Sequence, residues 1–143
     1  MPKRPRLNGI VVLVVDDSPD TLYLVELLLV RQGANVVTAG SATEALRIVE
    51  KTPPDVILSD IGMPEMDGYM LIKKIRELER KKNQDAHIPA AAVTAFTSTA
   101  DRQKAILAGY QIHIPKPIDV EELLTTVARL AGRTEKHFSG DQV

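Results

Sequence analysis

The sequence predicts one α/β domain, in which an open parallel sheet is covered by helices on both faces. Short runs of β-branched and apolar residues alternate with segments of helical periodicity five times along the chain. The first and third runs are almost entirely apolar, as is typical of strands buried on both faces. A chain of 143 residues with 44% hydrophobic and 26% charged residues also suits one domain with one core.

The first unit begins with a strand at residues 10–15. Ser18 and Pro19 follow, and they predict a helix N-cap and a first helical residue. Apolar residues at helical spacing continue from there, and the helix is expected to end near Gly33, a typical C-cap residue.

The second unit has a short strand at residues 35–39. Ser41 and Glu44 have the spacing of a capping box, so a helix is expected to begin there. Its apolar stripe consists of Ala42, Ala45, Leu46 and Val49. Pro53 and Pro54 end the helix, because proline cannot donate a backbone hydrogen bond and restricts the residue before it.

The third unit has a strand at residues 55–59 and a loop that leads through Gly68 into a helix. We expect the core-facing side of this helix to carry Leu71, Ile75 and Leu78. We expect its solvent-facing side to carry Lys73, Lys74, Arg76 and Glu77.

The last two units consist of strands at residues 88–94 and 111–114, a helix at roughly 99–108, and a final helix capped by Asp119. Apolar residues recur at helical spacing in the final helix: Val120, Leu123, Leu124, Val127 and Leu130. After Gly132 the sequence turns polar.

The predicted organisation is an N-terminal tail over residues 1–7, one domain over 8–132 and a C-terminal tail over 133–143. A net charge of −1 predicts no direct binding of nucleic acid. The absence of cysteine excludes disulfides, thiolate catalysis and thiolate-bound zinc. No apolar run reaches membrane-spanning length and none resembles a signal peptide, so we expect no membrane insertion and a cytoplasmic location.

Polar side chains follow four of the five predicted strands. Asp16 and Asp17 come after the first strand, Asp60 after the third and Lys116 after the fifth, while Thr94 closes the fourth. Ligands of open α/β sheets bind outside the carboxyl ends of the strands, which lie at one edge of the sheet. We therefore expect these side chains to converge.

Three carboxylates in one cleft repel each other, and burial disfavours each charge further. Mg²⁺ and the Lys116 ammonium group would offset this repulsion, because Mg²⁺ prefers carboxylate and carbonyl oxygens and water. Thr94 offers a hydroxyl that donates a hydrogen bond. The set suits phosphoryl transfer to a carboxylate. Each residue alone has a simpler explanation, such as a capped turn, an exposed lysine or a strand-forming threonine, but their predicted convergence at one edge favours a single site.

These residues resemble the receiver domain of bacterial two-component response regulators, and the resemblance covers about residues 8–132. Residues 60–68, DIGMPEMDG, resemble the phosphorylation loop of that family. The acidic pair of the family resembles VVDD at residues 14–17. Its switch threonine resembles the threonine of VTA at residues 93–95, and its lysine–proline element resembles PKP at residues 115–117.

The resemblance implies a flavodoxin-like (βα)5 fold with strand order 2-1-3-4-5. It implies that Asp60 accepts a phosphoryl group from the phosphohistidine of a histidine kinase or histidine phosphotransfer domain. Mg²⁺ would be bound directly by Asp17 and Asp60, mostly through water by Asp16, and by the backbone carbonyl of Gly62. The peptide bond before Pro117 is usually cis in this family.

The resemblance also implies a switch in which Thr94 and Lys116 bind phosphoryl oxygens and a residue on the fifth strand fills the space that Thr94 leaves. The family usually has Tyr or Phe there, but this chain has His113, which we expect to pack as an aromatic residue would; an added pH sensitivity is the alternative. Tyr110 is not assigned to the switch. Phe96 is expected to shield the site partly from water.

The predicted function is that of a phosphoaccepting receiver, which switches a surface for a downstream protein partner. It would be either a single-domain response regulator or part of a larger kinase or regulator, and we expect it not to be an enzyme. Three alternatives remain. An aspartyl-phosphate hydrolase normally has a second Asp two residues after the nucleophile, where this chain has Gly62. A nucleotide-binding module needs a glycine-rich phosphate loop, which is absent. A domain of the same fold that is not phosphorylated would be expected to lack a site residue.

Overall fold

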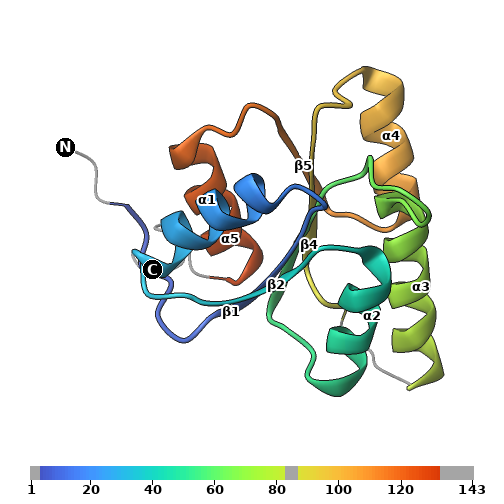
Figure 1. The fold of residues 1–143 in the computed structure, drawn as a ribbon, viewed down its shortest axis with the longest axis horizontal. Coiled ribbons are helices and arrows are strands. Elements are labelled where there is room, and N and C mark those ends of the chain that lie inside the picture. The colour runs from blue at the N-terminus through green and yellow to red at the C-terminus, as the bar shows by residue number, and fades with distance from the viewer. Residues whose placement is uncertain (1–3, 83–86, 133–143) are drawn as a thin grey trace, which may run out of the picture.

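The structure, a computed structural model, describes residues 4–82 and 87–132. Within these residues, strands and helices alternate along the chain (Figure 1). The strands are β1 (Val11–Val15), β2 (Asn35–Ala39), β3 (Val56–Ser59), β4 (Ala90–Thr94) and β5 (Ile112–Pro115). The helices are α1 (Pro19–Val30), α2 (Ala42–Lys51), α3 (Gly68–Lys81), α4 (Thr99–Ala108) and α5 (Val120–Leu130).

All strand pairs are parallel, and the sheet has the order β2-β1-β3-β4-β5. Both the predicted fold class and the predicted strand order are therefore confirmed. Helices α1 and α5 cover one face of the sheet, and α2, α3 and α4 cover the other (Figure 1). The strand order reverses at β1, because β1 pairs with both β2 and β3, so the carboxyl ends of these strands form the switch point of the sheet.

Two hydrophobic cores form, one on each face of the sheet. Residues of β1 alternate between them, with Leu13 and Val15 on the α2–α3–α4 side and Val12 and Val14 on the α1–α5 side. Strand β4 is buried along its whole length, but most of its side chains are small. The larger Tyr110 joins Ala90 and Ala92 in the same core.

Most helix starts agree with the sequence. The side chain of Ser18 caps α1, and that of Asp119 caps α5. The predicted capping box of α2 forms only in part: Ser41 Oγ accepts a hydrogen bond from the Glu44 amide, but the Glu44 carboxylate accepts from the amide of Gly40. The capping box with both hydrogen bonds is at the start of α4.

The predicted solvent-facing position of Arg76 is wrong. Arg76 is buried in α3, and so is Glu79, whereas Leu78 is only half-buried. The Arg76 guanidinium donates to both carboxylate oxygens of Glu79 at 3.0 and 2.9 Å. The Glu79 carboxylate also accepts from the Ile88 amide and contacts His87 Nδ1 at 2.7 Å. Mutual pairing and these further partners explain why both charges are buried.

The packed part of the chain extends slightly beyond the predicted domain start. Leu7 is fully buried, and its amide donates to the Gln32 carbonyl at 2.7 Å. Residues 1–3 of the predicted N-terminal tail and all of the predicted C-terminal tail, 133–143, lie outside the described residues.

Candidate functional site

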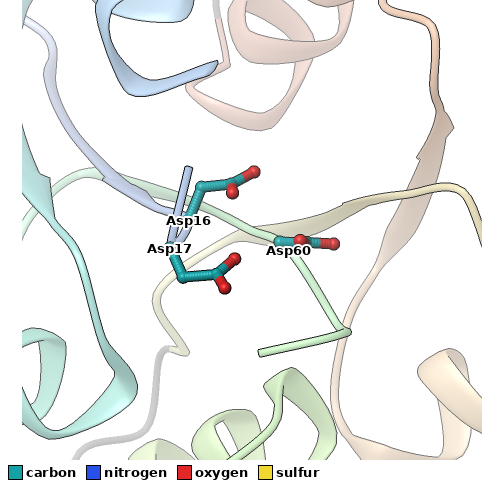
Figure 2. A group of neighbouring side chains, drawn as sticks. All are labelled: Asp16, Asp17 and Asp60. Carbon is teal, nitrogen blue, oxygen red and sulfur yellow. The ribbon is translucent and has the colours of Figure 1, made fainter. Parts of the chain in front are cut away.

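The three predicted acidic residues come together at the carboxyl edge of the sheet. Asp16 and Asp17 directly follow β1, and Asp60 directly follows β3. Carboxylate oxygens of the three lie within 4.8 Å of one another. Their side chains project from adjacent strand ends toward one side (Figure 2). Asp16 and Asp60 are buried and Asp17 is exposed, so the group is open to solvent at Asp17.

The sheet itself positions two of these residues. The Asp16 amide donates to the Ala39 carbonyl at 3.1 Å, and the Asp60 amide donates to the Val15 carbonyl at 2.9 Å. Each carboxylate is then oriented by a nearby backbone amide: Asp16 Oδ1 accepts from Ser18 at 2.9 Å, and Asp60 Oδ1 accepts from Ile61 at 2.7 Å. The second oxygen of each carboxylate, Oδ2, faces the side chain of Lys116.

Lys116, the residue directly after β5, joins the acidic residues. Its Nζ lies 2.9 Å from Asp16 Oδ2 and 3.4 Å from Asp60 Oδ2, so one ammonium group bridges two carboxylates. Its amide donates to the Thr94 carbonyl, and the bond from Lys116 to Pro117 is cis, as the resemblance implies. Burial lowers the pKa of Lys116, but the hydrogen bond to Asp16 and the charge of Asp60 outweigh burial and raise this pKa overall.

The pKa of Asp60 is raised above its usual value. Burial contributes most to this rise, the Lys116 charge opposes it, and the Asp16 charge adds to it. The folded protein therefore holds the Asp60 proton more tightly than the unfolded chain does. Its free energy of unfolding consequently falls as pH rises from the unfolded-state pKa through the raised folded-state pKa, and it stays lowered above that range.

We therefore predict that Asp60→Asn raises the free energy of unfolding in metal-free buffer at pH 7. The gain should vanish below pH 3.8, the usual pKa of the carboxyl group. Urea unfolding at several pH values measures this, and Glu50→Gln, which neutralises an exposed carboxylate on α2, is the matched control. A less stable Asp60→Asn protein at pH 7 would mean that pairing with Lys116 outweighs the cost of burial.

The donor set fits a hard divalent cation. Three carboxylates from two adjacent strand ends supply oxygen ligands, one of them accessible to solvent. Mg²⁺ binds through a few carboxylates and retains several waters, which the exposed position of Asp17 allows. Because Lys116 pairs with only two of the three carboxylates, a further cation would be favoured there.

The other predicted site residues lie around this group. Thr94 is buried at the end of β4, and its Oγ1 accepts a hydrogen bond from the Phe96 amide at 3.1 Å. Among the described residues this bond leaves the hydroxyl hydrogen of Thr94 without an acceptor. His113 Nε2 donates to the Phe96 carbonyl at 3.0 Å, so His113 contacts the β4–α4 loop and does not point at the carboxylates. The Phe96 ring lies against Gly62, and a Cβ there would be 3.1 Å from Phe96 Cζ.

The loop between Asp60 and α3 closes tightly at Gly68. The Gly68 amide donates to the Ile61 carbonyl at 2.8 Å. A Cβ at Gly68 would overlap the Asp60 carbonyl oxygen and would lie 2.8 Å from Ile61 Cα. Both are backbone atoms, which cannot move aside as the end of a flexible side chain can.

We predict that Gly68→Ala lowers the free energy of unfolding by about 1–3 kcal/mol, the usual range for overpacking a fitted site. Urea denaturation measures the change. Gly40→Ala is the control, because the atom nearest to a Cβ at Gly40 is 4.0 Å away, in the flexible Glu44 side chain. Equal stability losses in the two variants would show that the contact at Gly68 does not constrain the loop.

One residue that contacts this loop was not predicted from the sequence. Tyr110 is buried, and its hydroxyl donates to the Gly68 carbonyl at 2.8 Å. The small side chains of β4, among them Ala90 and Ala92, were the available signal, because an alanine-rich central strand leaves space that a neighbouring element must fill.

Comparison with known proteins gives a consistent result. Residues 12–128 match the family described as the response regulator receiver domain. An uncharacterized 14.6 kDa protein of Leptolyngbya boryana is 42% identical over 116 residues, which are 81% of this chain and 86% of that protein. Hybrid signal transduction histidine kinase D of Dictyostelium discoideum is 34% identical over 128 residues, which are 87% of this chain but 8% of the kinase.

A solved structure agrees with the fold. The Vibrio cholerae chemotaxis protein CheY4 aligns with a TM-score of 0.77 and 34% identity, and the alignment covers 85% of this chain and 98% of that protein. The similarity to CheY4 and to the Leptolyngbya protein spans most of each molecule. The similarity to the kinase is confined to a small part of it.

Proposed function

Because the chain belongs to the response regulator receiver domain family, whose members include the phosphoaccepting domains of response regulators and histidine kinases, we propose that Asp60 is its phosphoacceptor. The observation that carries this proposal is the group of three carboxylates within 4.8 Å, two of them bridged by Lys116. Asp60 belongs to both arrangements and lies where β3 meets its loop. Lys116 Nζ lies closer to Asp16 Oδ2, at 2.9 Å, than to Asp60 Oδ2, at 3.4 Å, so Asp60 is the more loosely paired of the two carboxylates.

In the proposed reaction, an Asp60 carboxylate oxygen attacks the phosphorus atom of a phosphohistidine. A P–O bond forms, the P–N bond breaks, and the released imidazole nitrogen keeps the electron pair and takes a proton from solvent. The Lys116 ammonium group stays near enough to Asp60 to pair with the phosphoryl oxygens. The Thr94 hydroxyl can donate a hydrogen bond to one of them.

Mg²⁺ is the proposed metal, and Asp17, Asp60 and the Gly62 carbonyl would hold it directly, with Asp16 mostly through water. When bound, it neutralises charge on the transferring group. The residues of the chain bring the carboxylates together, and the exposed position of Asp17 leaves the site open to water and to the phosphoryl donor.

The phosphorylated state would act through the β4–α4 loop. Phosphorylation replaces one negative charge with roughly two and adds acceptor oxygens. If Thr94 turns toward them, it gives up its bond with the Phe96 amide, while His113 holds the carbonyl of the same residue. We propose Thr94 and His113 as the switch residues. The resulting change in surface would be read by a downstream protein.

We further propose that the chain is a phosphoacceptor rather than an enzyme that turns over an external substrate, and that it receives its phosphoryl group in the cytoplasm from a histidine kinase or phosphotransfer protein. No helix among the described residues is long and apolar enough to cross a membrane.

The test is incubation with Mg²⁺ and a phosphorylated histidine phosphotransfer protein, with protein-bound and free phosphate measured over time. A receiver should load rapidly to at most one phosphoryl group per chain and then release phosphate slowly. Continuous phosphate release at many turnovers per chain would instead favour a hydrolase. No loading with several competent donors would favour a domain that binds partners without phosphorylation.

A further inference from the structure

Tyr110 lies in the segment between α4 and β5 and contacts the loop that begins at Asp60. Its side chain is 2% exposed, and its hydroxyl donates to the carbonyl of Gly68, the first residue of α3. Buried tyrosine hydroxyls usually find a hydrogen-bond partner. Here the partner is the backbone at the end of the predicted phosphorylation loop, 42 residues away in the sequence.

Gly68 is connected in turn to the backbone around Gly62. The Ile61 carbonyl accepts hydrogen bonds from the Gly68 amide at 2.8 Å and from the Met63 amide at 3.0 Å. Gly62 is the residue between Ile61 and Met63, so its peptide groups belong to the turn that this shared carbonyl closes. Gly68 is therefore held on its amide side by the turn around Gly62 and on its carbonyl side by Tyr110.

The contact between Gly68 and Asp60 leaves little room for movement. A Cβ at Gly68 would overlap the Asp60 carbonyl oxygen, which also accepts a hydrogen bond from Ser59 Oγ at 2.9 Å. A shift of Gly68 toward Asp60 would thus displace the backbone of the predicted phosphoacceptor. A shift away from Asp60 would lengthen the bond from the Gly68 amide to the Ile61 carbonyl.

Tyr110 is itself fixed in place. Arg76 Nε and Nη2 donate to the carbonyl of Gly109 at 3.1 and 2.8 Å, and the Tyr110 amide donates to the Ala105 carbonyl at 3.1 Å. The Arg76 guanidinium is held by the buried Glu79. The hydroxyl of Tyr110 therefore extends from an anchored backbone and from a packed ring, and it can act as a fixed support for Gly68.

From these contacts we propose that Tyr110 is a positioning residue for Mg²⁺ binding. Its hydroxyl holds Gly68 in place. Through Gly68 it also holds the backbone of Asp60 and the turn around Gly62 in the arrangement that binds the metal. The inference rests on the magnesium-dependent phosphorylation proposed above. Tyr110 contacts neither the carboxylates nor the phosphoryl group in this role. Its effect should therefore be on metal affinity more than on the rate of the metal-loaded protein.

The test compares wild-type protein with Tyr110→Phe, which removes the hydroxyl and keeps the ring. The control is Tyr69→Phe, because Tyr69 is also buried in the same core, but its hydroxyl has no hydrogen bond among the described residues. Isothermal titration calorimetry gives the Kd for Mg²⁺ of the unphosphorylated proteins. Phosphorylation by acetyl phosphate over a range of Mg²⁺ concentrations gives the half-saturating concentration and the maximal rate separately.

We expect Tyr110→Phe to raise both the Kd and the half-saturating Mg²⁺ concentration about three- to tenfold, the range that corresponds to one hydrogen bond, with a maximal rate within about twofold of wild type. Tyr69→Phe should leave all three values unchanged. Urea unfolding will verify that each variant is folded, which we expect because only one hydroxyl is lost.

A wild-type Kd for Mg²⁺ in Tyr110→Phe would overturn the inference, even if the variant unfolds at a lower urea concentration, because Tyr110 would then be a packing residue only. Equal increases of the Kd in Tyr110→Phe and Tyr69→Phe would overturn it as well. If wild-type protein binds Mg²⁺ but is not phosphorylated, the proposed function fails while the comparison of Kd values still decides the role of Tyr110. If wild-type protein binds no Mg²⁺, both proposals fail.

Discussion

Lys116→Met is expected to slow phosphorylation about 100- to 1,000-fold, the usual effect of removing a group that stabilises charge in a transition state. Lys116 Nζ lies 2.9 Å from Asp16 and 3.4 Å from Asp60, and no second ammonium or guanidinium group pairs with these carboxylates among the described residues. The variant should also bind Mg²⁺ more tightly, because the carboxylates lose a competing positive charge. A slower maximal rate together with a lower Kd for Mg²⁺ would therefore identify the role of Lys116 as phosphoryl stabilisation.

Lys104→Met is the matched control for this variant. Lys104 lies over the ring of Tyr69, with Nζ 4.4 Å from the ring centroid, and among the described residues it forms no ion pair with Asp16 or Asp60, which pair with Lys116. Its replacement should leave both the rate and the Kd for Mg²⁺ unchanged. The account of Lys116 would be contradicted if Lys116→Met kept the wild-type rate at saturating Mg²⁺.

Asp17→Asn is expected to weaken Mg²⁺ binding about 100-fold. Residues that only support metal ligands typically cost about 10- to 100-fold in metal affinity when mutated, and a residue that binds the metal directly should cost at least as much. Asp17 is the exposed member of the group and has no ion pair with Lys116, so its carboxylate is available to a cation. Phosphorylation at a limiting Mg²⁺ concentration should fall by a similar factor and should recover in part at high Mg²⁺ concentration. Calorimetric titration and the rate of phosphorylation by acetyl phosphate measure the two effects.

Asp20→Asn is the control for Asp17, because Asp20 is an exposed carboxylate in the first turn of α1, outside the group of three. A neutral asparagine there should have little effect on either measurement. If Asp17→Asn and Asp20→Asn behave alike, Asp17 is not a metal ligand and its contribution is only to the general field of negative charge.

Local sequence features predicted much of the fold because they act over short distances. The strand at residues 35–39 was predicted with its observed bounds, and Ser18 and Asp119 begin the helices that their side chains were expected to cap. Asp16 and Asp60 meet because parallel strands place their carboxyl ends at one edge of the sheet. That convergence follows from topology and did not require knowledge of any side-chain contact.

Features that depend on contacts between distant segments could not be predicted in the same way. Periodicity placed Arg76 in solvent, since no rule based on spacing could reveal the Gly109 carbonyl that it binds from 33 residues away. The contact of Tyr110 with the loop could not be predicted for a similar reason, because its hydrogen-bond partner Gly68 lies 42 residues away in the sequence. The Glu44 carboxylate accepts a hydrogen bond from the amide of Gly40 and not from that of Ser41. Which amide it contacts depends on the backbone geometry of that turn.

The most direct test of the central claim is the intact mass of the wild-type protein and of Asp60→Asn after incubation with Mg²⁺ and acetyl phosphate. We predict that wild-type protein gains one phosphoryl group, that Asp60→Asn gains none, and that EDTA abolishes the gain. Proteolytic mapping of the wild-type product should place the group within residues 60–68. A phosphoryl group on Asp60→Asn, or equal gain with and without EDTA, would contradict the assignment of Asp60 as a metal-dependent phosphoacceptor.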